Sequence, residues 1–186
     1  MHEDTVYYLT VIPTKKGGYC SAWDYIDKSE YAENASTYIH AFKIIQNDLK
    51  NLFRFIEPNQ VNYQCYSYEI YSLFIKTCIE IEQNFKTILK KNDYTDGKKK
   101  ENYWNLKDYK ILEGTHKLSH FNVTLPSYNL KFTPFSSWIE AETFWYKEYN
   151  ELKHARINHF EKANLENLLN AVCGLLVILS AQFFDG

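Results

Sequence analysis

The first long stretch of regular polarity lies between residues 38 and 56, where apolar residues recur at alternating steps of four and three. This spacing places them on one face of a helix, and the pattern ends before Pro58, which a helix interior does not tolerate. Ser36 or Thr37 stands where a helix cap is expected. The apolar face consists of Tyr38, Phe42, Ile45, Leu49, Leu52 and Ile56.

A second apolar stripe predicts a longer helix over residues 64–91. The connection between the two stripes is short and polar, which predicts an antiparallel pair of helices. Glu82 and Lys86 lie off the stripe at a favourable i, i+4 spacing. The stripe itself contains Ile70, Leu73, Phe74, Thr77, Cys78, Ile81, Phe85, Ile88 and Leu89.

The last apolar segment predicts a helix that begins after Asn164, a good capping residue. Its apolar run Ala171–Ala181 is about half the length that a membrane span needs, so we expect a buried core helix and no membrane association. Asn167 and Asn170 interrupt the segment, and the joint at 155–163 is expected to supply backbone partners for them.

The middle of the chain is less regular. Residues 103–118 predict a shorter helix, and alternating apolar residues between 121 and 135 predict either a small hairpin or an extended loop. Ser137 and Glu140 have the spacing of a capping box, which predicts a helix from there to about His154.

Residues 1–36 show no sustained period; they predict a short extended piece at Val6–Ile12 followed by irregular structure. The sequence therefore predicts an all-α protein, with an irregular or extended N-terminal appendage at 1–36 and an antiparallel helical bundle at 37–186.

Composition narrows the function classes. The 186 residues are 45% hydrophobic, enough for a sizeable core, and the net charge is −2, so any basic surface must be local. The N-terminus has neither a basic region nor a long apolar region, and we expect a cytoplasmic protein without a signal peptide. The four cysteines have no metal-ligand spacing and are expected to be buried, reduced thiols: Cys20, Cys65, Cys78 and Cys173.

The side chains best suited to catalysis or phosphate binding are concentrated in the polar run from Trp145 to Phe160. Asn150 and His154 are four apart and share a helix face, whereas His154 and Arg156 point in nearly opposite directions unless the helix ends near His154 and the backbone turns. A histidine can move protons near neutral pH, and Arg156 or Lys153 could hold a phosphate. The structural alternative is a helix C-terminus whose dipole favours cations.

Three stretches of sequence resemble a bacterial branch of the HEPN-like proteins. They are Pro134-Phe135-x-x-Trp138, Trp145-x-x-x-Tyr149-Asn150-x-x-Lys153-His154-x-Arg156 and Phe160-x-x-Ala163-x-Leu165. The similarity covers roughly residues 38–184. It implies a small helical bundle that dimerises, and a metal-independent ribonuclease of a toxin–antitoxin, phage-defence or RNA-processing system.

The family's usual site has an Arg followed by a His after four to six residues, and this chain departs from it. Arg156 precedes His159 by only three positions. Either Lys147 stands in for the Arg ahead of His154, without the planar bidentate geometry of a guanidinium, or Asn150, Lys153, His154 and Arg156 form a rearranged site.

The resemblance implies attack by a ribose 2′-hydroxyl on the neighbouring phosphate. His154 would be the general acid or base, Arg156 and Lys153 would stabilise charge, and Asn150 would position the histidine or the phosphate. Lys147, Tyr149 and His159 would contact the RNA. The expected partners are RNA, a second copy of the chain, and a cognate antitoxin or defence-system protein, with no cofactor and no metal.

Two alternatives stay open. His116 and His120 have a zinc-ligand spacing, but Lys117 stands where a zinc peptidase has Glu and no third ligand is evident. At the level of function, the alternative to the nuclease is a non-catalytic HEPN-like module that dimerises or binds a partner.

Overall fold

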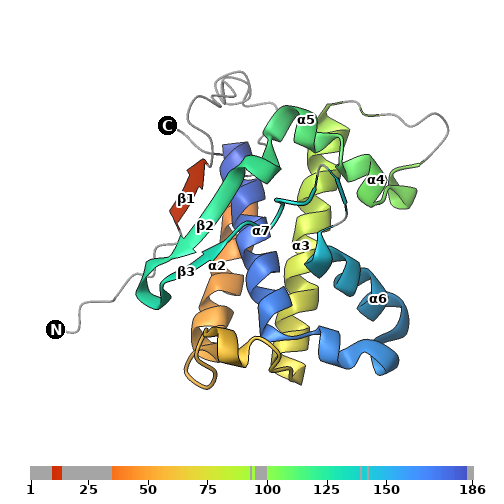
Figure 1. Ribbon diagram of the computed structural model, residues 1–186. Helices are drawn as coiled ribbons and strands as arrows, with labels where there is room; N and C mark the ends of the chain where they lie inside the picture. The colour runs from red at the N-terminus through yellow and green to blue at the C-terminus, as the bar shows by residue number, and fades with distance from the viewer. Residues whose placement is uncertain are drawn as a thin grey trace.

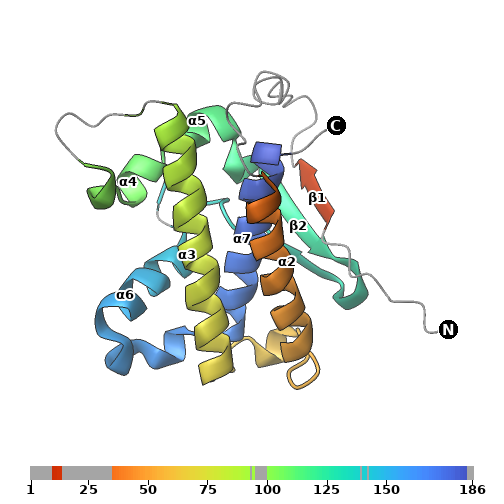
Figure 2. The same ribbon diagram turned by 180° about the vertical axis from the view of Figure 1, so that it is seen from behind.

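The computed structural model describes residues 10–13, 35–92, 94, 100–138, 140–141 and 143–183. Within them the chain is mainly helical, with one small antiparallel sheet. The long helices α2 (Ala35–Leu52), α3 (Tyr68–Lys91) and α7 (Leu165–Phe183) stand side by side. Helix α6 (Phe144–His159) lies on the side of α3 opposite α2 (Figures 1 and 2).

Helix α7 is the centre of the fold. It packs most extensively on α3 and also contacts α2, α6 and the sheet (Figure 1). Among the described helices, only α7 is long and apolar enough to cross a membrane, but 72% of its apolar window is buried inside the protein. The prediction of a core helix is thus confirmed, and so is its start, where Asn164 Oδ1 accepts from the Asn167 amide at 3.0 Å.

The two predicted apolar stripes form α2 and α3, which confirms the helix pair. The connection is longer than predicted. Helix α2 ends at Leu52 and not at Ile56, and α3 begins at Tyr68 and not at Gln64. Helix α3 starts later than Gln64 because Ser67 caps it, with Oγ accepting from the Ile70 amide at 3.2 Å. The residues before the cap form a short 3-10 turn, Gln60–Asn62.

The segment at 121–135 forms the predicted hairpin. Strand β2 (Phe121–Leu125) pairs antiparallel with β3 (Leu130–Phe132), and Asn129 adopts the left-handed conformation that ends the turn, with φ 52°. Strand β1 (Thr10–Pro13) pairs with the other edge of β2. Residues 6–9 of the predicted extended piece lie outside the described residues, as does the rest of 1–36 apart from 10–13 and Ala35–Ser36.

Two helix predictions were wrong in their limits. Residues 103–118 form two short helices, α4 (Leu106–Tyr109) and α5 (Leu112–His116). Asn105 and Asp108 build a capping box that starts α4, and Lys117, at φ 50°, ends α5.

The helix predicted to start at Ser137 begins instead at Phe144. The preceding segment forms turns because Phe135 and Trp138 both enter the core, where their ring centroids are 4.6 Å apart. The carbonyl oxygen of Ser137 accepts a hydrogen bond from the Ala141 amide at 2.8 Å, as in a turn. The capping-box pattern was therefore overridden by tertiary packing of aromatic side chains.

The cysteine prediction is confirmed for Cys78 and Cys173, which are buried and unpaired. Burial raises the pKa of both thiols, so they stay protonated. It is wrong for Cys65, which is exposed in the α2–α3 connection. Cys20 lies outside the described residues.

Candidate functional site

Helix α6 is held by one apolar face. Trp145, Tyr149 and Leu152 follow each other at steps of four and three and are all buried, together with Tyr146. The Trp145 Nε1–H donates to the carbonyl oxygen of Pro134 at 2.9 Å. This face fixes which residues of the polar run are turned outward.

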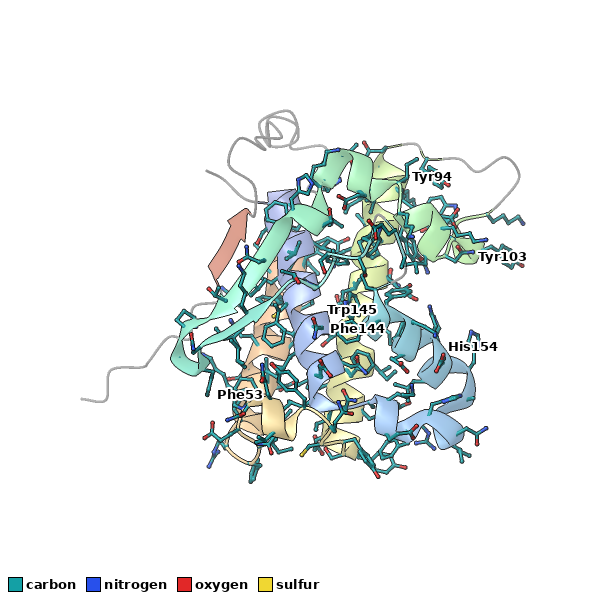
Figure 3. The ribbon with its side chains drawn as sticks, viewed as in Figure 1. Phe53, Tyr94, Tyr103, Phe144, Trp145 and His154 are labelled. Atoms are coloured by element: carbon teal, nitrogen blue, oxygen red, sulfur yellow. The ribbon has the colours of Figure 1, made fainter. Side chains whose placement is uncertain are left out.

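The backbone of α6 breaks at Ala155, where φ is −145° and ψ is 56°. This is the break after His154 that the sequence required before His154 and Arg156 could approach each other. His154 is exposed on the outer side of α6, away from α3 and α7 (Figure 3). Within the described residues its side chain has no hydrogen bond or ion pair.

Lys153 is committed to a carboxylate. Its Nζ lies 3.3 Å from both carboxylate oxygens of Glu82 on α3 and 5.3 Å from the centroid of the Tyr149 ring. The Tyr146 hydroxyl donates to the same Glu82 at 3.0 Å. Glu82 therefore points inward, its side chain 14% exposed, and pairs with Lys153.

Glu82 and Lys153, with the neighbouring Tyr146 and Tyr149 rings, form a fixed ion pair. Burial first, and then the negative charge of Glu82, raise the pKa of Tyr146 and Tyr149 well above the ordinary range. Both hydroxyls therefore stay protonated, and the cluster joins α6 to α3. The Glu82 carboxylate balances the positive charge of Lys153, which weakens its predicted role in holding a phosphate.

Arg156 binds a different part of α3. Its guanidinium carbon lies 5.8 Å from the ring centroids of both Tyr68 and Tyr71, and Nη1 donates to the Tyr68 hydroxyl at 3.3 Å. Phe160 packs against the same tyrosines, with its ring centroid 5.0 Å from that of Tyr68, and it also contacts Tyr66. Tyr68 is 62% exposed, so this aromatic cluster is a surface feature.

The predicted single cluster is thus divided into two. Glu82 and Tyr71 are eleven residues apart on one straight helix, or about 16 Å at 1.5 Å per residue. Lys153 and Arg156 are anchored at these separate levels. Within one chain they do not converge on one phosphate.

The remaining predicted residues are distributed as follows. Lys147 is exposed and Asn150 half-buried on α6, and neither side chain has a hydrogen bond or ion pair within the described part of the chain. His159 Nδ1 lies 3.9 Å from a carboxylate oxygen of Glu151. Tyr149 is 1% exposed, so its predicted contact with RNA is wrong: it belongs to the buried face of α6.

Two groups of residues were missed by sequence reasoning. Tyr146 completes the Glu82 cluster, and its position next to Trp145 on the buried face was the available signal. Tyr66 and Tyr71 surround Phe160. Their spacing around Tyr68 indicates a tyrosine-rich helix start, but only the tertiary fold brings it to Phe160.

The histidine pair at 116 and 120 does not have the geometry of a helical zinc motif. No group of three or more His, Cys, Asp or Glu side chains suited to a metal occurs among the described residues. Helix α5 ends at His116, so the two histidines do not share a helix face. His116 is buried, and its Nδ1 lies 2.8 Å from the Thr115 hydroxyl.

His116 predicts a loss of stability in acid. Burial lowers its pKa from 6.5 to about 4. Below pH 6.5 the unfolded chain takes up a proton that the folded chain refuses until about pH 4, so the free energy of unfolding falls through this window, by on the order of 2 to 3 kcal/mol. Urea unfolding at several pH values should show a shallower slope for His116→Gln. His40→Gln, at an exposed site on α2, should retain the wild-type slope, and equal slopes for all three proteins would contradict the assignment.

Comparison of the chain with protein-family models, with curated proteins and with solved structures gives no match. The functional conclusion therefore depends on the residues of the site and on the resemblance in its sequence.

Proposed function

We propose that this chain is a HEPN-like, metal-independent endoribonuclease that acts in the cytoplasm as the effector of a bacterial defence or toxin–antitoxin module. The observation that carries the proposal is that two exposed side chains, His154 and Arg156, lie on either side of the α6 break. Within the described residues, His154 and Arg156 have no carboxylate partner, and both are exposed. The other basic side chains after Asn150 lie beside glutamates: Lys153 beside Glu82, His159 beside Glu151 and Lys162 beside Glu148.

These two groups suit phosphodiester cleavage. An arginine is a planar donor for two phosphate oxygens. The Tyr68 ring, 5.8 Å from the guanidinium carbon, and its hydroxyl, which accepts from Nη1, hold the Arg156 side chain in place. A solvent-exposed imidazole is available to move a proton. In this mechanism the 2′-hydroxyl oxygen attacks the phosphorus as His154 removes the hydroxyl proton. The 5′-oxygen leaves with a proton, and the products are a 2′,3′-cyclic phosphate and a 5′-hydroxyl end.

A single chain presents one such histidine, whereas the reaction uses both a base and an acid. A two-fold dimer would supply a second His154 from the other chain. This is the arrangement that the HEPN-like resemblance implies.

The alternative function is a HEPN-like module that binds RNA without cutting it. The division between Lys153 and Arg156 favours this alternative, since one cation of the predicted site is neutralised by Glu82. Binding by Arg156 and the exposed Tyr68 would suffice for such a module, because an unpaired base stacks on an aromatic ring and its phosphate pairs with the cation.

The test is incubation of a labelled unpaired RNA with the purified protein in EDTA. We expect cleavage with 2′,3′-cyclic phosphate ends, and binding that weakens about tenfold in Arg156→Ala, as loss of a stacked, phosphate-binding cation predicts. Lys131→Ala removes an exposed cation from β3 and serves as the matched control with wild-type binding. Binding without cleavage would support the non-catalytic module, and absence of both would overturn the RNA proposal.

A further inference from the structure

A surface hollow of about 390 Å³ is lined by residues of α2 and α3, the two helices that stand in front of α7 in Figure 2. The two helices are antiparallel, and two contacts fix their register. Lys76 pairs with Asp48 at 2.6 Å, and the Tyr38 and Thr87 hydroxyls lie 2.9 Å apart near the other end. Since α6 lies on the opposite side of α3, this hollow is separate from the site described above.

The hollow combines an apolar floor with a charged rim. Leu52 and Leu73 are buried beneath it, and Phe55 is 83% exposed at its edge. The rim carries two carboxylates and one ammonium group, because Asp48 is paired with Lys76 and Glu69 has no ion pair within the described residues. The hollow is therefore negative overall, with an unpartnered carboxylate next to an exposed aromatic ring.

Beyond the hollow, exposed apolar residues follow on both helices, and we call the hollow together with them the α2–α3 groove. Ile44 lies one turn before Asp48 on α2, and Ile79 lies one turn after Lys76 on α3. They are 43% and 45% exposed. From Glu69 to Ile79 the groove spans ten residues of α3, or about 15 Å.

We infer that this α2–α3 groove docks an amphipathic helix of a partner protein that carries basic residues between two apolar anchors. Three turns of a helix span about 16 Å and bring positions i, i+4, i+7 and i+11 onto one face. Anchors at i and i+11 match Phe55 at one end and the two isoleucines at the other. Basic residues at i+4 and i+7 would lie beside Glu69 and the Asp48–Lys76 pair, where two carboxylates outnumber one ammonium group. This excess of negative charge attracts a basic helix and would repel a nucleic-acid phosphate.

The test uses a stapled helical peptide of about 18 residues, with Leu at i and i+11 and Arg at i+4 and i+7 on an alanine-rich background. Titration into the isotope-labelled full chain, followed by amide chemical shifts, should give saturable changes along α2 and the first half of α3. A peptide with Glu at i+4 and i+7 should bind at least about tenfold more weakly, as expected for like charges in the groove. Agmatine, an alkyl guanidinium, is the small-molecule control.

Two variants locate the site. Glu69→Lys and Phe55→Ala should each weaken the Arg peptide about tenfold or more, whereas Glu140→Lys, the same charge change at an exposed turn, should leave binding unchanged. The inference is overturned by equal binding of the Arg and Glu peptides, by no saturable shift at about 1 mM peptide, or by shifts elsewhere on the chain. Agmatine binding as tight as the peptide would make the hollow a small-cation site and overturn helix docking.

Discussion

Replacement of Trp145 by alanine is expected to lower the free energy of unfolding by about 3 to 5 kcal/mol. The indole is fully buried and connects three parts of the fold. Its Nε1 donates to the Pro134 carbonyl, and its ring centroid lies 5.8 Å from that of Phe135. On α7, Gly174 leaves room for the ring: a Cβ added there would lie 3.2 Å from Trp145 Cζ2.

The loss is large because the neighbours cannot refill the space. Gly174 has no side chain to move into the cavity, and the Pro134 carbonyl would lose its donor in a buried site. Urea unfolding monitored by circular dichroism measures the effect. Trp145→Phe retains part of the ring and should give a smaller loss, and Tyr103→Ala, at a 69% exposed ring, should change stability by less than about 0.5 kcal/mol. A loss below about 1 kcal/mol for Trp145→Ala would contradict the assigned role.

The long helices were predictable because their side chains repeat at the helical period over several turns. The apolar face of α2 contains Phe42, Ile45 and Leu49, all buried as expected. The same holds for the stripe of α3 and for α7 after its Asn164 cap. The partner of Asn167 was also foreseen, since its amide donates to the Lys162 carbonyl in the joint before α7 at 2.7 Å.

The segment before α6 was not predictable from local pattern. Ser137 and Glu140 satisfy a capping-box rule that depends only on spacing. The outcome was decided by Phe135 and Trp138, whose burial against Phe85 of α3 depends on residues about fifty positions away. The pairing of β1 with β2 is non-local in the same way, since more than one hundred residues separate Thr10 from its partner Thr124.

In the candidate site, too, some features could be predicted from the local sequence and others depend on the fold. The step from Trp145 to Tyr149 and Leu152 marks a buried face, and this periodicity argues against a substrate contact for Tyr149. The sequence predicts a helix end near His154, and the backbone does break at the next residue. Alanine itself gives no reason for the break, because it has the highest helix propensity. The placement of Arg156 on Tyr68 depends on the break and on the fold together.

Replacement of His154 by alanine is expected to reduce RNA cleavage by about 10² to 10⁴-fold, the usual contribution of a general acid or base. The side chain is exposed and, among the described residues, makes no hydrogen bond, so its loss should leave both the fold and RNA affinity close to wild type. The decrease should therefore appear in the single-turnover rate and not in the binding constant. Arg156→Ala should lower both, because the guanidinium contacts the phosphate before and during the reaction.

Chemical rescue separates a catalytic role of His154 from a structural one, because added imidazole can replace a missing base but not a missing structural contact. Added imidazole should restore part of the rate of His154→Ala, since a small base can occupy the space that the exposed side chain leaves, and it should have little effect on Arg156→Ala. Lys131→Ala, on the distant sheet, should cleave at the wild-type rate. Wild-type cleavage by His154→Ala would exclude His154 as the base. Arg156, held on its tyrosine rings, would then keep only its proposed role in RNA binding.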